Sequence, residues 1–592
     1  MKKALFISVM LSAMLISACS TQTGESDPAG NSSSGAPAQS SSQPAADSSS
    51  SESQTFTVSL NKTELSLTIN GSEQLTATSN MAGASIVWSS SDTETVSIDQ
   101  LGNVTGLKEG TATVTATIKD RQESASCEVT VVGDYFIKEE TSIVVETSSN
   151  DTNGQILQDA IAALQKKEPK LTVKYTKFSG SYNDLKEDAI KGYSAGNYPD
   201  VIVAYPDAVA DFINANMQLN MNKYIDNEDY GWTDEERDDF YASDLKEGSS
   251  YAVRGTYSLP FAKSTEAMYY DEDKLIGLNL GATINGGKAL DENYFNNLTW
   301  DELFNKLCPA LLSYRESLSS DELKKAFLDT SESDKWSVVG YDSDDNLFIT
   351  LANQYGYGYT SIDEITKTGI VDFVNDGMKG LMKQFNGYKQ NKYLHTAGTL
   401  GERTNKPFGE DKVLLSIGST GGVSYQFNSN NPKNIKVARI PQADLSNPKN
   451  IQQGPSLAFL KHPDNTDNRG LGAWLFYKEI TSVNNCIAWV TTSGYSPVRK
   501  SVSESDDFLD FADPDNHPNK TIDRLKALNA VYADSVANSL FSSPVFKGSS
   551  EAREQVGSLV TDILLKENLT DADVDAAFKK AYDNTILAIE GK

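Results

Sequence analysis

The sequence predicts two α/β lobes that follow a small all-β sandwich. A length of 592 residues is too great for one hydrophobic core. Between residues 55 and 133 short apolar runs alternate with polar residues at strand spacing, and from about residue 134 to 592 strand patterns alternate with helical ones. Strands and helices in alternation are typical of open α/β sheets, and about 450 residues suit two lobes with a cleft between them.

The N-terminus has the order of a secretion signal. Two lysines precede a short apolar stretch at residues 4–16, which is too short to be a settled membrane-spanning helix. The sequence then reads ISAC, ending at Cys19. This run resembles the lipobox of bacterial lipoproteins, which implies removal of residues 1–18 and lipidation of Cys19 on the extracytoplasmic face of a membrane. An ordinary signal peptide with an incidental cysteine is the alternative.

Residues 19–54 are dominated by serine, glutamine, alanine, glycine and proline, with almost no large apolar side chain. Such a segment cannot bury enough surface to offset its chain entropy, so we expect a disordered tether. The tether is either a spacer that lifts the folded part from the membrane or neutral filler, and both interpretations predict the same structure.

Residues 55–133 carry the signals of a small antiparallel β-sandwich, with strand candidates that alternate in polarity and turn signals such as Asn70-Gly71 between them. The run "VSLNKTELSLTINGSEQLTAT…IVWSSSDTETVSIDQLGNVTGLKEGTATVTAT" resembles a bacterial immunoglobulin-like domain of group 2. The resemblance implies a spacer, with adhesion to a glycan or cell surface as the alternative.

The segment from 134 to 592 begins with strand and helix in turn. Residues 142–146 and 171–175 are strand candidates, and residues 155–167 and 182–193 have helical spacing of apolar side chains. The run "GNYPDVIVAY" then predicts a turn followed by a buried strand. These elements predict repeated βαβ units.

Several runs in this segment resemble extracellular solute-binding proteins of ABC importers, the family of maltose-type and glycerol-3-phosphate-type binders. They are "LQKKEPKLTVKY", "AIKGYSAGNYPDVIVAY", "YSLPFAKSTEAMYYDEDKL", "LTWDEL", "FGEDKVLLSIGSTGG", "AWLFYKEITS" and "WVTTSGYSPVRKS". The resemblance implies the type II two-lobed periplasmic-binding-protein fold, a permease partner in the membrane, and no catalysis. Residues between about 321 and 405 match the family poorly.

By position against the family, the resemblance places ligand contacts after strands, at the crossovers, in the SGYSP turn and near the start of a late helix. These are Tyr182, Tyr205, Asp207, Ser264, Glu266, Ser419, Thr420, Gly454, Ser456, Tyr495 and Arg553. Tyrosine suits a sugar because it offers an apolar ring and a polar tip.

Each of these positions also has a structural interpretation. The tyrosines can cap the core, Asp207 is a candidate N-cap of the following helix, and Arg553 is a candidate for a surface salt bridge. Ser264 and Glu266 can be turn residues of a crossover, and Gly454 and Ser456 can shape a turn. Trp474 lies in an apolar helical pattern, which favours the core.

Charge and composition exclude several classes of function. The chain carries 81 acidic and 52 basic residues, a net charge of −29, which repels nucleic acid. Its three histidines lie far apart and no zinc-ligand spacing occurs, so we expect no metal and no cofactor. Three cysteines remain after Cys19, and we expect them to be buried free thiols.

The favoured function is capture of a carbohydrate by a monomeric, lipid-anchored binding protein that serves an importer. Binding of glycerol 3-phosphate or a related phosphodiester is the alternative, supported by Lys263, Arg499 and Arg553. A cell-surface adhesin and a glycan-acting enzyme are the alternatives from other classes; no nucleophile elbow or P-loop accompanies the many carboxylates.

Overall fold

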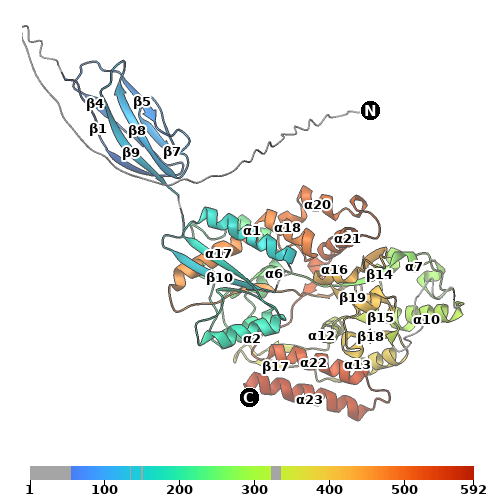
Figure 1. Cartoon of the computed structure of the whole chain (residues 1–592). Coiled ribbons are helices and arrows are strands. Elements are labelled where there is room, and N and C mark those ends of the chain that lie inside the picture. Colours follow the sequence, from blue (N-terminus) through green and yellow to red (C-terminus); the bar gives the residue numbers. More distant parts are fainter. Residues whose placement is uncertain (1–54, 134, 149–150, 320, 322–334, 592) are drawn as a thin grey trace, which may run out of the picture. The chain divides into compact units, whose positions relative to one another are not determined.

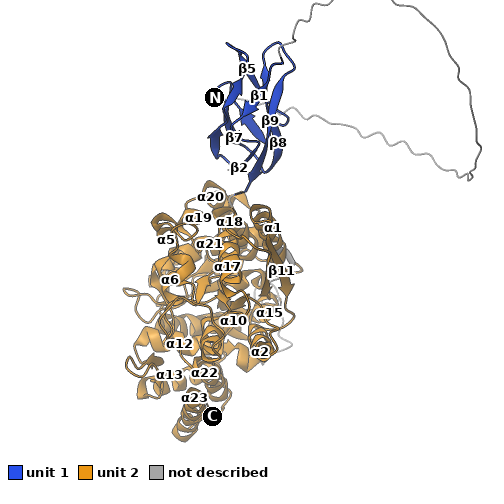
Figure 2. Ribbon diagram, turned by 90° about the vertical axis from the view of Figure 1, so that its left-hand side faces the viewer, with its two compact units in different colours: residues 1–133 blue, residues 134–592 orange. Residues whose placement is uncertain are grey.

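The computed structural model describes residues 55–133, 135–148, 151–319, 321 and 335–591. The signal sequence, Cys19 and the tether therefore lie outside the described residues. The chain divides into two compact units, Met1–Gly133 and Asp134–Lys592 (Figure 2). Each unit has its own hydrophobic core.

The first unit is a β-sandwich. One sheet has the order β2-β9-β8-β5 and the other has the order β3-β7-β6, with β1 and β4 paired beside them. The strand bounds are β1 Val58–Leu60, β2 Glu64–Thr68, β3 Ser72–Gln74, β4 Ala77–Ser79, β5 Ile86–Ser90, β6 Val96–Ile98, β7 Asn103–Gly106, β8 Gly110–Ile118 and β9 Ser124–Val132. The alternating apolar side chains point inward, and Trp88 and Val114 lie in this core.

The prediction of an antiparallel sandwich is wrong for one pair of strands. Strand β2 runs parallel to β9, with Leu65 opposite Val129 and Leu67 opposite Val131. These strands come from opposite ends of the unit and no tight turn joins them, so no hairpin forces them to be antiparallel.

The first lobe of the second unit is built on a mixed sheet with the order β11-β10-β12-β22-β13. Its strands are β10 Thr141–Thr147, β11 Leu171–Lys177, β12 Val201–Ala204, β13 Ser258–Pro260 and β22 Ser456–Phe459. The strands β10, β11 and β12 are parallel, and β22 is antiparallel to both of its neighbours. Every residue of β12 is buried, because helices cover both faces of the sheet.

Two helices of the first lobe, α1 Asp151–Lys167 and α2 Tyr182–Tyr193, contain the segments 155–167 and 182–193 for which the sequence predicts helical periodicity. Further helices of this lobe are α3 Pro206–Asn214, α4 Asn222–Ile225, α5 Asp234–Asp239, α6 Ala242–Glu247, α17 Thr466–Ile480, α18 Val483–Ser493, α19 Lys500–Ser503 and α20 Asp506–Ala512. Helix α2 begins at a capping box in which Ser181 and Asp184 exchange hydrogen bonds. Trp474 is fully buried in α17, as predicted.

The second lobe has a sheet with the order β18-β15-β19-β14-β20. Its strands are β14 Glu266–Asp271, β15 Ser337–Tyr341, β18 Leu394–Thr396, β19 Val413–Ser419 and β20 Ile435–Ala438, and a small hairpin is formed by β16 Thr360–Ile362 and β17 Gly369–Val371. Strands β14 and β19 are buried almost throughout, so their apolar runs show no alternation.

Helices cover the two faces of this second sheet (Figure 1). The described α-helices and the π-helical segment are α7 Glu272–Leu275, α8 Glu292–Asn296, α9 Trp300–Glu302, η2 Leu303–Leu307, α10 Cys308–Ser317, α12 Asp344–Tyr355, α13 Asp376–Gln390, α14 Ala397–Leu400, α15 Asn405–Gly409, α16 Val423–Gln426, α21 Ile522–Ser535, α22 Ser549–Leu564 and α23 Asp571–Glu590. Helices α12, α13 and α22 pack on one core, and α21 packs on the opposite face of the sheet.

The chain passes between the lobes through short connections. One lies between β13 and β14, and another returns from β20 to β22 through β21 (Asn450–Ile451), which pairs with β23 (Leu540–Phe541). Ser264 bridges to Gln453, and Lys263 bridges to Ser496. The crossovers are therefore hydrogen-bonded to one another.

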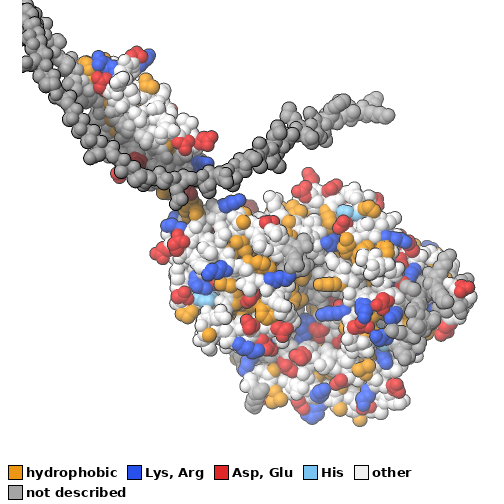
Figure 3. Space-filling model, viewed as in Figure 1, with side chains coloured by type: hydrophobic (Ala, Val, Ile, Leu, Met, Phe, Trp, Pro, Cys, Tyr) orange, Lys and Arg blue, Asp and Glu red, His pale blue; other side chains and the backbone are white. Residues whose placement is uncertain are grey.

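Cys127, Cys308 and Cys486 are buried and unpaired in disulfides, as expected. Across residues 55–591, leaving aside the stretches that are not described, no helix has the length and apolarity to cross a membrane. Acidic and basic side chains intermingle over the visible face of the second unit (Figure 3).

Candidate functional site

An ion pair joins the two lobes of the second unit. Asp207 lies in the first turn of α3, and its Oδ2 is 3.4 Å from Nε of Arg553 in α22 of the second lobe. Ser549, at the start of α22, donates a hydrogen bond of 3.2 Å to Oδ1 of Asp207. The alternative in which Asp207 is the N-cap of α3 is wrong, because Tyr205 occupies the N-cap position and Pro206 begins the helix.

Arg553 is held from the second lobe by the first turn of α12. Its Nη1 donates to Asp345 Oδ2 at 2.7 Å and to Asn346 Oδ1 at 2.6 Å. Burial disfavours the charge on Arg553, but Asp345 and Asp207 outweigh burial and raise its pKa further above the ordinary value. Arg553 is therefore a permanent cation between carboxylates of both lobes, which is more than a surface salt bridge.

Glu266 begins β14 and is 1% exposed. Its Oε2 accepts a hydrogen bond from the Tyr341 hydroxyl, and the Asn346 amide also bonds its carboxylate. Burial raises the pKa of Glu266 to about 8 against these hydrogen bonds. At neutral pH Glu266 is therefore mainly protonated and can both donate and accept hydrogen bonds.

Tyrosines gather on the first-lobe side of the same region. The rings of Tyr182 and Tyr205 meet edge to face with centroids 5.1 Å apart, and the Tyr495 phenol lies close to both. Burial and the neighbouring phenols raise the pKa of Tyr495. Tyr205 keeps 37% of its surface exposed, and Tyr425 of α16 in the second lobe is 73% exposed. These rings can present faces to a ligand.

We call this region the interlobe site and define it by residues from both lobes. Its members are Tyr182, Tyr205, Asp207, Glu266, Asn346, Tyr495 and Arg553. Tyr182, Tyr205 and Asn346 follow the ends of β11, β12 and β15, the edge at which open α/β sheets bind ligands. Glu266 begins β14, and Arg553 lies within α22. Aromatic faces beside carboxyl, amide and guanidinium groups can cover an apolar ring face and satisfy hydroxyls around its rim.

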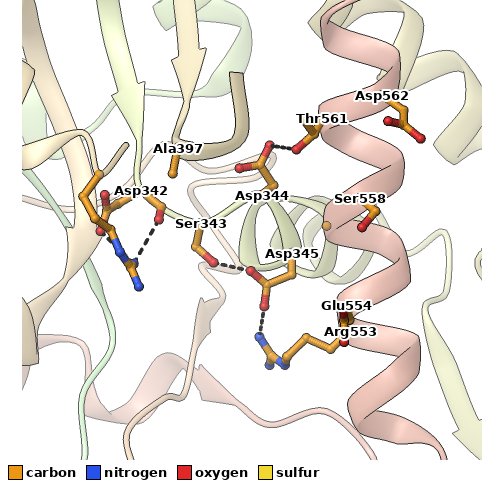
Figure 4. Close-up of a pocket in the computed structure, with 12 residues that line it drawn as sticks. Asp342, Ser343, Asp344, Asp345, Ala397, Arg553, Glu554, Ser558, Thr561 and Asp562 are labelled. Carbon is orange, nitrogen blue, oxygen red and sulfur yellow. Dashed lines mark hydrogen bonds and ion pairs between the residues drawn. The ribbon is translucent and has the colours of Figure 1, made fainter. Parts of the chain in front are cut away.

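An open pocket of about 460 Å³ extends from Arg553 across the second lobe (Figure 4). The starts of α12 and α14 and one face of α22 form its walls. Its carboxylates are partly occupied: Asp344 accepts hydrogen bonds from Thr396 at 2.6 Å and Thr561 at 2.9 Å. Arg403 is 3.1 Å from Asp342, and its side chain is 74% exposed. The second lobe therefore offers further polar groups next to Arg553.

Three predicted residues lie at the crossover beside the loop after β19. Ser419 donates a hydrogen bond of 3.2 Å to Ser264, and the backbone of Thr265 donates to Oγ1 of Thr420 at 3.1 Å. Thr420 is fully buried, and Ser264 is 3% exposed. These contacts hold the chain just before β14 against the end of β19, at the edge of the interlobe site.

Gly454 and Ser456 belong to a buried polar cluster at the return crossover. Lys263 forms an ion pair with Glu247 and donates to the Gly454 carbonyl at 3.2 Å, and Ser456 donates to Glu247 at 3.3 Å. Gly454 has φ of +87°, and a β-carbon there would lie 2.0 Å from the Ala262 carbonyl oxygen. The glycine is thus required by both its conformation and its close approach.

The sequence reasoning missed Tyr341, Asp345, Asn346 and Tyr359, all within the span that matched the family poorly. Burial raises the pKa of Tyr359, and this effect outweighs the nearby Arg553, whose positive charge lowers the same pKa. A signal was present in "VVGYDSDDNLF", where a buried strand ends in a serine N-cap and acidic residues. Among the residues with described coordinates, no group of three or more metal-binding side chains occurs.

The fold and this site define a two-lobed binding protein rather than a catalyst. Residues 159–517 match the model of the bacterial extracellular solute-binding proteins, which spans more than half of the chain. The chain belongs to that family. Residues 55–129 match the bacterial Ig-like domain of group 2. The predicted fold class and family are confirmed, and so is the prediction of a binding protein in place of an enzyme.

Solved structures agree in fold. UgpB from Mycobacterium tuberculosis in complex with glycerophosphocholine is 15% identical, with a TM-score of 0.56 over 76% of this chain and 98% of that one. A cyclic α-maltosyl-1,6-maltose binding protein from Arthrobacter globiformis is 14% identical, with a TM-score of 0.54 over 75% of this chain and 99% of that one. An ABC substrate-binding protein from Listeria monocytogenes in complex with cycloalternan is 12% identical, with a TM-score of 0.54 over 75% of this chain and 99% of that one.

Curated relatives match only short stretches. Two uncharacterized proteins of Clostridium acetobutylicum are 41% identical over 78 residues and 35% identical over 104 residues. These stretches cover 12% and 17% of this chain, and 8% and 25% of the relatives. The chain therefore spans at most a quarter of the length of these relatives.

Proposed function

We propose that this chain captures a neutral oligosaccharide in the interlobe site and delivers it to an ABC importer. The observation that carries the proposal is the set of tyrosine rings, Tyr182, Tyr205 and Tyr495, placed beside hydrogen-bonding groups of both lobes. Binding proteins of this architecture can close two lobes over a ligand and bury most of its surface. Similar folds have been solved with cycloalternan and maltotriose, which supports the carbohydrate class.

The partners of the basic residues also favour a neutral ligand. Lys263 is paired with Glu247, Arg499 lies 3.0 Å from Asp239, and Arg553 is shared between two carboxylates. A phosphate would have to displace these partners, because phosphate recognition needs available cations or a helix N-terminus. The three cations that supported a phosphodiester are therefore engaged within the protein.

A glycerophosphodiester is the second candidate. Arg403 lines the pocket next to Arg553; its Nη1 pairs with Asp342 at 3.1 Å, but 74% of its side chain is exposed, so its other donors are available to an anion. The similarity in fold to UgpB, which was solved in complex with glycerophosphocholine, also supports this candidate. The two candidates differ in whether Arg403 is required for binding.

Thermal-shift measurements on the full chain distinguish these functions. A ligand that binds only the folded state raises apparent stability, by about 2.7 kcal/mol at a hundredfold excess over Kd. We expect a rise with an oligosaccharide such as maltotriose or cycloalternan, and none with glycerol 3-phosphate or glycerophosphocholine. A rise with the phosphates alone, lost in Arg403→Ala, would replace the first candidate with the second.

We further propose that Cys19 carries the lipid anchor, that residues 19–54 form a tether, and that the Ig-like unit is a spacer for a monomeric binder. The supporting observation is the lipobox-like run that ends at Cys19. Replacement of Cys19 by serine should move the protein from the membrane fraction to the medium and abolish labelling by a fatty-acid analogue. Persistence of the label in the variant would contradict the anchor.

A further inference from the structure

A second pocket lies in the second lobe, lined by residues outside the interlobe site. Its volume is about 360 Å³, within the range of small-molecule sites. It lies among the α9–η2 segment, the end of α12 and the second half of α13. We call it the side pocket and define it by Trp300, Asp301, Tyr355, Gln384, Tyr388 and Asn391.

The aromatic side chains of the side pocket are held in place by the core. The Tyr388 ring stacks on Phe304 with centroids 4.3 Å apart. Trp300 is 3% exposed, and its indole nitrogen donates to Gln354 at 2.7 Å, so Trp300 contributes to the floor but not to hydrogen bonding with a ligand. Burial raises the pKa of Tyr355 to about 12. Both tyrosines therefore remain protonated and present half-buried rings.

The polar groups of the side pocket are free to bind. Among the described residues, the Tyr355 hydroxyl and the side-chain amides of Gln384 and Asn391 have no hydrogen-bond partner. Asp301 accepts a hydrogen bond of 2.8 Å from Asn305 through Oδ1. Its other oxygen has no such partner in the described part of the chain. At the interlobe site, by contrast, Arg553 is engaged by two carboxylates, those of Asp207 and of the neighbouring Asp345.

The helix that carries this wall is irregular. At η2 the backbone of Cys308 donates to Leu303, five residues earlier, which makes a π-helical turn. Such turns are uncommon and recur at functional sites. The π turn lies between Asp301 and α10, and Asn305, the partner of Asp301, lies within it.

We infer that the side pocket is a second carbohydrate site that binds one pyranose ring of a neutral glycan. Rigid aromatic rings cover an apolar sugar face, while a carboxylate, two amides and a phenol match hydroxyls on its rim. No lysine or arginine lines the pocket, and Asp301 is exposed there, which disfavours phosphates and other anions. Such a site goes beyond the proposed function, because it would hold a sugar unit apart from the interlobe site.

Fluorine NMR of the full chain labelled with 5-fluorotryptophan tests this inference. The chain has six tryptophans, so its spectrum is simple, and Trp300→Phe identifies the side-pocket signal. Trp489, whose ring stacks on Tyr495 at 6.3 Å, reports on the interlobe site. The probes are maltotriose, cellotriose, xylotriose and mannotriose, with choline and glycerol 3-phosphate as charged comparisons. We expect at least one trisaccharide to shift the Trp300 signal saturably.

Matched variants separate a direct effect from one transmitted from the interlobe site. Gln384→Ala and Tyr355→Ala should weaken the Kd read from Trp300 at least tenfold while any shift of Trp489 keeps its Kd. Tyr582→Ala, an exposed tyrosine of α23, should change neither signal. Asp207→Ala should leave the Trp300 response unchanged.

The inference is overturned if no trisaccharide shifts Trp300, if the shift survives both side-pocket variants, or if choline alone produces it. If the proposed function failed instead, the trisaccharides would not shift the Trp489 signal and would not raise the unfolding temperature of Gln384→Ala. Both variants alter side chains at the pocket surface, and their unfolding temperatures verify that they fold.

Discussion

Arg553 in α22 and Asp207 in α3 form an ion pair that connects the two lobes, with Nε 3.4 Å from Oδ2. Arg553 is also bound by Asp345 within its own lobe. The same guanidinium thus completes the second lobe and holds the first lobe against it. Because Arg553 keeps Asp345 when Asp207 is removed, changes on the two sides of its guanidinium should have different consequences.

Asp207→Ala should loosen the contact between lobes without unfolding either one. The pair is partly exposed, so its loss should cost about 0.5–1 kcal/mol, and Asp345 remains to hold Arg553. Small-angle X-ray scattering should show a larger radius of gyration in the free variant. Lys186→Ala, which breaks an ion pair to Asp211 inside the first lobe, is the control and should leave the radius unchanged. Equal radii for wild type and Asp207→Ala would contradict an interlobe role.

Tyr205→Ala should weaken oligosaccharide binding tenfold to a hundredfold, about 1.4–2.8 kcal/mol, because it removes an exposed ring face at the interlobe site. Tyr205→Phe keeps the ring and should bind within a few-fold of wild type. Calorimetric titration measures both values. Equal losses in the two variants would show that the hydroxyl, and not the ring, makes the contact.

Glu266 should make stability fall as pH rises. Its pKa is raised from 4.5 to about 8, so the folded protein holds this proton more tightly than the unfolded chain. Stability from this group is lost between about pH 4.5 and 8 and then stays constant. Glu266→Gln, which mimics the protonated form, should therefore gain up to about 5 kcal/mol over wild type at pH 9 and little at pH 4. Denaturant unfolding across this range gives the difference.

Asp244→Asn provides the comparison for that pH series. Asp244 accepts a hydrogen bond of 3.0 Å from Gln452 near the return crossover, and burial raises its pKa from 3.8 to about 7. The difference in unfolding free energy between Asp244→Asn and wild type should level off near pH 7. This is about one pH unit below the pH at which the difference for Glu266→Gln levels off. Difference curves that level off at the same pH would contradict the separate assignment.

Gly454→Ala should destabilise the protein by about 3 kcal/mol or more, because the substitution combines a positive φ with a clash against the Ala262 carbonyl. Gly356→Ala is the matched control: φ is +71° but the space is open, so only left-handed strain of about 1 kcal/mol is expected. Thermal unfolding of both variants checks the order. Similar losses would show that conformation alone requires glycine at position 454.

Much of the fold was predictable from local pattern. Residues 182–193 were predicted as a helix and form α2 with the same bounds, because the helical spacing and the Ser181 cap are both local signals. The parallel pairing of β2 with β9 was not predictable, since nothing in either strand specifies the direction of a partner from the far end of the unit.

The candidate site was predicted less completely. Sequence by itself determined the family, because its runs can be compared directly with those of known members. It also predicted the two-lobed fold and the positions of tyrosines and acids after strands, because periodicity and turn residues are local features. Only the tertiary structure decided that Arg553 and Asp207, 346 positions apart, form one ion pair between lobes, and that Tyr341 and Asn346 bond Glu266. Burial, pairing and the resulting pKa depend on neighbours that the chain brings together only when both sheets are folded.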